Sequence, residues 1–189
     1  LPETLEALAE RVVAMANAAP PDPYCGLAEA GLIARTFPEL DLDDGSDISA
    51  DALSTRAKEA EDAALAIQGV TNSSGAGASF GRGSVYLATS AGFAGSYQGT
   101  THSVSASVLA GEGTGMERDY DFSSARHLAD LEAAAEIGKR AGEKTVRRLG
   151  ARKVKSQAVP IIYDPRVSNS LLGHFAGAIS GSAVARGTS

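Results

Sequence analysis

The stretch that decides the fold is GSYQGTTHSVSASVLAG, residues 95–111. Apolar and polar side chains alternate along it, and a period of two is typical of a strand with one buried face. The face that we expect to point toward a core carries His102, Val104, Ala106, Val108 and Ala110. The opposite face carries Thr101, Ser103, Ser105, Ser107 and Leu109.

The neighbouring segments predict further strands. The residues from Val70 onward are rich in glycine, serine and threonine, and both SVYLATS (84–90) and GMERDYDFS (115–123) alternate. Only the short, glycine-containing stretches SAGFAG (90–95) and GEGTG (111–115) separate these runs. Short turns between successive strands favour an antiparallel meander, because parallel strands need long crossover connections.

Helices are predicted on both sides of these strands. Helical spacing of apolar residues indicates helices at 1–19 and 50–67, the second capped by Ser49, at 128–149, and from Arg166 to the end. A short buried strand is predicted at 157–165. The expected fold class is therefore α+β, an antiparallel meander with packed helices. We place an N-terminal α+β domain at 1–150 and the start of a C-terminal domain at 151–189.

The composition excludes several classes of protein. Hydrophobic residues make up 43% and charged residues 21% of the 189 positions, and the net charge is −6, which is ordinary for a soluble domain. The longest apolar stretch is too short and too polar for a membrane span. Residues 139–155 hold eight cations and one acid, but helix polarity accounts for half of them and no aromatic residues are interleaved. We therefore expect no membrane contact and no direct nucleic-acid binding, and a single cysteine fits the cytoplasm.

The final predicted helix has an unusual composition. Gly173, Gly177 and Gly181 recur at spacing four, and each glycine in a helix interior costs about 1 kcal/mol relative to alanine. Close approach of another backbone is the usual reason for such a cost. We therefore expect this helix to be buried and tightly packed.

Three groups of residues could carry chemistry. His174 has no second metal ligand one turn away, since Ser170, Gly177 and Ala178 occupy those positions. His102 lies among serines without a G-x-S-x-G motif, so we expect a core or interface histidine. The three acids at 117, 119 and 121 share one strand face, where they can bind a hard cation, face solvent or pair with arginines; we favour the last two.

Two long stretches resemble the TldD/PmbA family on its PmbA (TldE) branch. They are SVYLATSAGFAGSYQGTTHSVSASVLAGEGTGMERDYDFSSARH (84–127) and PIIYDPRVSNSLLGHFAGAISGSAVARGTS (160–189). The resemblance implies a cytoplasmic, paired metalloprotease linked to proteolysis of unfolded peptides, to maturation of peptide antibiotics and to DNA gyrase phenotypes. Its TldD subunit carries the zinc motif H-E-x-x-x-H on a helix. Family members are much longer, so the resemblance also implies a fragment without its extreme N-terminus and most of its C-terminal domain.

The zinc motif of TldD can be laid over this chain from the shared LL at 171–172. Its first histidine then falls on Gly173, its glutamate on His174 and its second histidine on Ala178. The resemblance thus implies a non-catalytic PmbA/TldE-like subunit of a heterodimer, with zinc held by a TldD-like partner and no cofactor in this chain. It would present an unfolded peptide as an added strand. The residues that we expect in helix packing or subunit contact are Gly173, His174, Gly177, Gly181, Arg166 and Arg186.

Two alternatives remain open. The chain could belong to a metallopeptidase in its own right, with ligands in the missing C-terminal part, so whether it is an enzyme stays undecided. It could also belong to a regulatory interaction protein linked to DNA gyrase.

Overall fold

The computed structural model describes residues 4–23 and 25–189, which form two compact units that divide between Gly150 and Ala151. The assignment of an N-terminal α+β domain to 1–150 and of the start of a C-terminal domain to 151–189 stays a prediction. In chain order the elements are α1 (Leu5–Ala18), a 3-10 helix η1 (Ala30–Leu32), α2 (Ala50–Leu65), β1 (Val70–Ala88), β2 (Ala94–Ala110), η2 (Gly113–Gly115), β3 (Glu117–Ala125), η3 (Leu128–Asp130), α3 (Ala134–Arg147), α4 (Pro165–Ala178) and α5 (Gly181–Ala185).

The first unit is built on a three-stranded antiparallel sheet in the order β1-β2-β3. The register places Phe80 of β1 opposite His102, and Asp121 of β3 opposite Ala106. This is the meander that the alternation and the short turns predict, so the α+β fold class is confirmed. β1 and β3 are the two edge strands of the described sheet.

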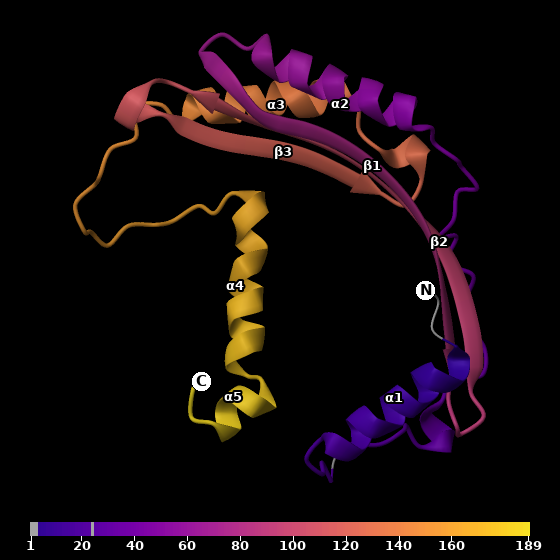
Figure 1. Cartoon of the computed structure of the whole chain (residues 1–189). Helices are drawn as coiled ribbons and strands as arrows, with labels where there is room; N and C mark the ends of the chain where they lie inside the picture. Colours follow the sequence, from indigo (N-terminus) through magenta and orange to yellow (C-terminus); the bar gives the residue numbers. More distant parts are fainter. Residues whose placement is uncertain (1–3, 24) are drawn as a thin grey trace. The chain divides into compact units, whose positions relative to one another are not determined.

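Helices α2 and α3 lie side by side on one face of the sheet (Figure 1). The core between them consists of small and branched side chains: Ala60, Ala64, Val104, Ala106, Val108, Ala134, Ile137 and Ala141. The face of β2 that we predicted to be buried is therefore the one that the helices cover. On the other face, Tyr120 and Phe122 of β3 remain about half exposed.

Two glycines of α3 allow the helices to approach closely. A Cβ atom on Gly138 would overlap the carbonyl oxygen of Ala60 in α2. A Cβ atom on Gly142 would lie 2.9 Å from the carbonyl oxygen of Ala64 and 2.7 Å from Cγ1 of Ile67. Since real Cβ atoms do not come so near to a backbone carbonyl, only glycine permits this helix–helix distance at position 138.

The helix predicted at 128–149 is shorter in the structure. Residues 128–130 form η3, residues 131–133 are extended, and α3 begins only at Ala134. Tertiary hydrogen bonds explain the difference, because the N–H of Leu128 donates to Asp44 (2.8 Å) and the N–H of Glu132 donates to Ser123 Oγ (3.3 Å). These backbone groups are satisfied by β3 and by the acidic loop rather than by a helical turn. The N-cap of α2 is as predicted, since Ser49 Oγ accepts a hydrogen bond from the N–H of Ala52.

The second unit differs from the prediction in two respects. The strand predicted at 157–165 is absent from the described structure, and Ile162 is 98% exposed. A strand needs a paired neighbour to satisfy its backbone groups, and this segment has none. The predicted final helix is divided into α4 and α5, since Ile179 and Ser180 leave the helical conformation.

Candidate functional site

The positions equivalent to the zinc motif all lie on α4. Its N-cap is Asp164, whose carboxylate accepts from the N–H of Arg166 at 2.9 Å, and Pro165 opens the first turn. Gly173 and Ala178 have no ligating side chain, so His174 stands without a second donor on the helix. Within the described residues, no three His, Cys, Asp or Glu side chains come together as a metal site. The residues present at these positions therefore do not fit a zinc ion.

The remaining predicted site residues are not brought into one cluster. Gly173 and Gly177 lie on α4, whereas Gly181 begins α5 after the break, so the three do not form one continuous ridge. No atom lies within 4 Å of a Cβ built on any of them, and α4 has no buried residue. The expected tight packing of this helix is therefore not made by the described residues. Arg186 follows α5, where its Nε donates to the carbonyl of Ser182 (3.2 Å).

A buried polar network, which the sequence analysis missed, connects the acidic loop to the sheet. Asp44 Oδ2 lies 2.9 Å from Nε2 of His102 and accepts from the N–H of Leu128. Asp44 Oδ1 accepts from both the N–H (2.9 Å) and the hydroxyl (2.6 Å) of Ser46. The N–H of Asp44 donates to Thr100 Oγ1 at 3.1 Å. One aspartate thus fastens the loop to β2 and to the start of η3.

Asp44, His102 and Ser46 resemble a hydrolytic triad in composition but not in geometry. A triad needs the carboxylate on one ring nitrogen and the hydroxyl on the other. Here Ser46 Oγ (3.3 Å) and Asp44 Oδ2 both face Nε2 of His102, and Nδ1 is buried without a hydrogen-bond partner among the described residues. The histidine is fully buried, as predicted for a core histidine. This network is structural.

The electrostatics of Asp44 fit that role. Hydrogen bonds from the hydroxyl of Ser46 and from the N–H of Leu128 hold the pKa of the Asp44 carboxyl far below its ordinary value. The carboxylate is therefore charged throughout the physiological range, and a permanently charged acceptor makes strong hydrogen bonds to N–H donors. A D-x-S pattern in an acidic loop, typical of a turn closed by its own side chains, is the signal that could have revealed the network.

The acids of β3 form the second charged cluster, and they pair with α3. Asp121 accepts from Arg140 Nε (2.6 Å) and from Lys144 Nζ (2.8 Å), and Arg148 reaches Asp119 and Glu117. The side chains of Asp119 and Asp121 are 6% and 9% exposed. The predicted pairing with arginines is confirmed, and the solvated alternative is wrong for these two aspartates.

This pairing has two consequences. Burial raises the pKa of the Asp121 carboxyl, but the hydrogen bonds from Arg140 and Lys144 outweigh burial and leave the pKa below its ordinary value. The pairing also engages three of the eight cations in 139–155, which removes them from any surface that could attract nucleic acid.

The sequence of this chain matches one family model and several known proteins. Residues 43–149 match the model described as the PmbA/TldA metallopeptidase central domain. The chain is 33% identical over 186 residues to the metalloprotease PmbA of Escherichia coli O157:H7, covering 98% of this chain and 41% of that protein. It is 34% identical over 181 residues to a metalloprotease PmbA homolog of Haemophilus influenzae, covering 95% of this chain and 40% of that protein. The chain thus spans about two fifths of the length of these relatives.

Solved structures agree with this assignment. A protein of Bacteroides thetaiotaomicron described as a modulator of DNA gyrase superposes with a TM-score of 0.80 at 28% identity, covering 95% of this chain and 42% of that one. TldE from Thermococcus kodakarensis shares the fold, with a TM-score of 0.56 at 22% identity over 75% of this chain and 31% of its own. Among the described residues, no helix has the length and apolar composition of a membrane span. The extent of the family match and the identity to two PmbA proteins show that this chain belongs to the PmbA/TldD metallopeptidase family.

Proposed function

We propose that this chain is part of a non-catalytic, PmbA/TldE-like subunit of a cytoplasmic metalloprotease complex. A TldD-like partner supplies the zinc, and the pair acts on unfolded peptides and in peptide maturation. The observation that carries the proposal is the residue set of α4, where Gly173, His174 and Ala178 stand at the positions of the H-E-x-x-x-H motif. Without two histidines and a glutamate at that spacing, the helix lacks both the ligands and the general base of such a site.

The sheet supports a role in holding the substrate. β1 and β3 are edge strands of the described sheet, and the backbone groups of an edge strand can pair with an added extended peptide. Helices α2 and α3 cover one face of the sheet (Figure 1), so they leave the two edge strands open to an added peptide strand. The buried ion pairs between β3 and α3 hold that edge in place.

The decisive experiment measures peptide hydrolysis by three preparations: the protein alone, a TldD-like partner alone, and the mixture of the two. The proposal expects activity only in the mixture and loss of that activity when the histidines of the partner's motif are replaced. As a matched control, His174→Ala in this chain leaves the zinc content of the mixture unchanged, because His174 provides no ligand. Chelator-sensitive hydrolysis by this protein alone would overturn the proposal.

One alternative has a specific observation in its favour. The relatives carry the name metalloprotease, and this chain spans only about two fifths of their length. A metallopeptidase with its ligands outside these residues would be active without a partner. Metal analysis of the purified protein separates the two, since the proposal expects no stoichiometric zinc in the absence of the partner.

A further inference from the structure

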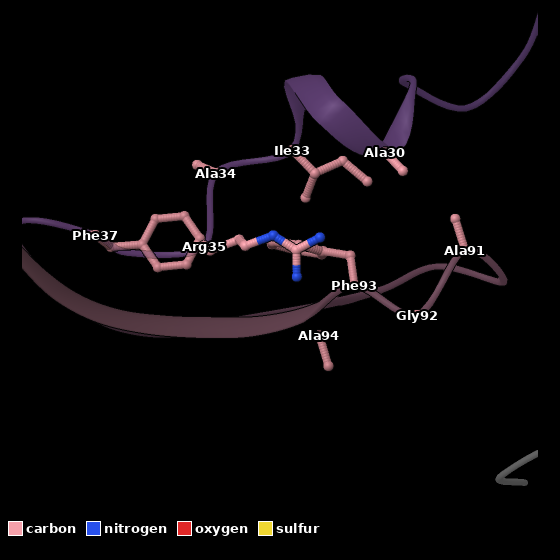
Figure 2. A pocket seen from close by; sticks show the side chains of 9 residues that line it. All are labelled: Ala30, Ile33, Ala34, Arg35, Phe37, Ala91, Gly92, Phe93 and Ala94. Carbon is pink, nitrogen blue, oxygen red and sulfur yellow. The ribbon is translucent and has the colours of Figure 1, made fainter.

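A hollow of about 270 Å³ lies between residues 30–37 and the turn at 91–94 (Figure 2). Most of its lining residues are small, and the large apolar ones are Ile33, Phe37 and Phe93, while polar atoms also contribute to the surface exposed inside it. Among the residues that the structure describes, Arg35 is the only charged one that lines it. The hollow lies outside the two charged clusters described above and outside α4.

Local hydrogen bonds and a ring contact build this hollow. The N–H of Thr89 donates to the carbonyl of Phe93 (2.9 Å), and the N–H of Gly92 donates to the carbonyl of Thr89 (3.1 Å). These bonds fix the turn that carries one wall. The rings of Phe37 and Phe93 then meet edge to face, with centroids 6.1 Å apart, and connect the two walls.

The charge of Arg35 is not compensated within the described residues. Its guanidinium group lies among the lining side chains (Figure 2), and no ion pair or hydrogen bond joins it to the described residues. Two other arginines of the same unit are paired, since Arg82 lies 2.9 Å from Asp43 and Arg140 lies 2.6 Å from Asp121. An unpaired guanidinium beside aromatic edges is complementary to a carboxylate that is attached to an apolar group.

We propose that this hollow binds the carboxyl-terminal end of a peptide, with the terminal carboxylate on Arg35 and an apolar last side chain against Phe37 and Phe93. A single cation suits a monovalent anion, and the rings of Phe37 and Phe93 suit an apolar side chain beside it. The volume accommodates one or two residues, because pockets for whole drug-sized ligands begin at about 300 Å³. The proposal rests on the proposed function for the source of its ligand, since an unfolded peptide offers a free carboxylate beside a side chain.

The test is equilibrium binding of short peptides to the purified protein, with a chelator present so that no hydrolysis interferes. The probe is tetraalanyl-leucine with a fluorophore attached through an amide to its amino nitrogen, compared with the same labelled peptide as its carboxamide. The free acid binds at least about tenfold more tightly than the amide, because charge-assisted hydrogen bonds are the stronger ones. Arg35→Ala abolishes this preference. Arg35→Lys keeps part of it, because lysine retains the positive charge but cannot donate two parallel hydrogen bonds to a carboxylate. Arg147→Ala, an exposed arginine of α3, leaves the preference unchanged although it alters the net charge equally.

Three results would overturn the proposal. The first is equal binding of acid and amide by the unaltered protein. The second is a preserved preference in Arg35→Ala, with circular dichroism showing that the variant is folded. The third is N-acetyl-leucine binding as tightly as the peptide, which would assign the hollow to small free carboxylic acids. These binding results do not depend on hydrolysis by the mixture, so failure here and failure of the proposed function remain distinguishable.

Discussion

Gly138 of α3 offers the sharpest test of how the helix layer is packed. The change is Gly138→Ala, which adds one methyl group where α3 faces Ala60 of α2. That methyl group would overlap the carbonyl oxygen of Ala60 and lie 2.8 Å from its carbonyl carbon and 3.1 Å from its Cα. All three are backbone atoms, so no side chain can rotate away and α2 itself must move.

Two effects of opposite sign set the magnitude. Inserting a methyl group into a packed core costs about 1–3 kcal/mol, and a clash with backbone belongs at the upper end. Replacing glycine by alanine inside a helix regains about 1 kcal/mol of helix propensity. The net loss is then about 2 kcal/mol, which corresponds to a decrease in Tm of about 4–8 °C for a chain of this length.

The assay is urea denaturation followed by circular dichroism at 222 nm, together with a thermal melt. We expect a lower urea midpoint with an unchanged slope, because the exposed surface of the unfolded chain does not change. The control is Gly173→Ala on α4, where a Cβ meets nothing within 4 Å; it leaves stability unchanged or raises it. Should Gly138→Ala prove as stable as the unaltered protein, the close approach of α2 and α3 would be refuted.

Three further predictions concern the charged clusters and α4. The free energy of unfolding falls as the pH drops below about 4, because the lowered pKa of Asp44 contributes stability in full above the unfolded pKa, and protonation of the folded protein removes this contribution at lower pH. Asp44→Asn makes this loss of stability shallower in denaturation series between pH 5 and 2. An unchanged pH dependence in the variant would contradict the prediction. Asp121→Ala lowers the urea midpoint more than Asp62→Ala does. The first variant leaves Arg140 and Lys144 without their buried partner, whereas the second removes an exposed ion pair worth about 0–1 kcal/mol. Equal midpoints for the two variants would count against the ion-pair network of β3 and α3. Under the proposed function, Gly177→Leu prevents assembly with a TldD-like partner in size-exclusion chromatography although it raises helix propensity, whereas Ala176→Leu on the same helix does not. Intact assembly of the glycine variant would exclude Gly177 from the contact.

Patterns with a local physical basis were readable without the structure. Alternation along residues 95–111 identified β2 and its buried face, and short glycine turns identified the meander. The serine at 49 and the helical spacing after it identified α2. In each case the side chains of one short segment contain the whole signal, because a pleated strand or an amphipathic helix sorts its residues by its own periodicity.

The failures share a different cause. The helix predicted from residue 128 starts at Ala134, because Asp44 and Ser123 take the backbone N–H groups that a helical turn would have used. The strand predicted at 157–165 does not form, because a strand depends on a neighbour that periodicity cannot supply. The structural use of glycine was expected at Gly173 and Gly177 but is seen at Gly138, where another backbone comes close.

The sequence by itself therefore determined the fold class, the family resemblance and the residues at the motif positions, Gly173, His174 and Ala178, since each depends on which residues follow one another along the chain. Only the tertiary structure decided that Asp44 connects the acidic loop to His102, that Asp121 is paired and buried, and that Arg35 lines a hollow without an ion-pair partner among the described residues. In each of these three sites, residues that are distant in the sequence come together. The neighbours that the fold supplies decide whether a charged side chain is buried and paired, and the sequence alone does not specify those neighbours.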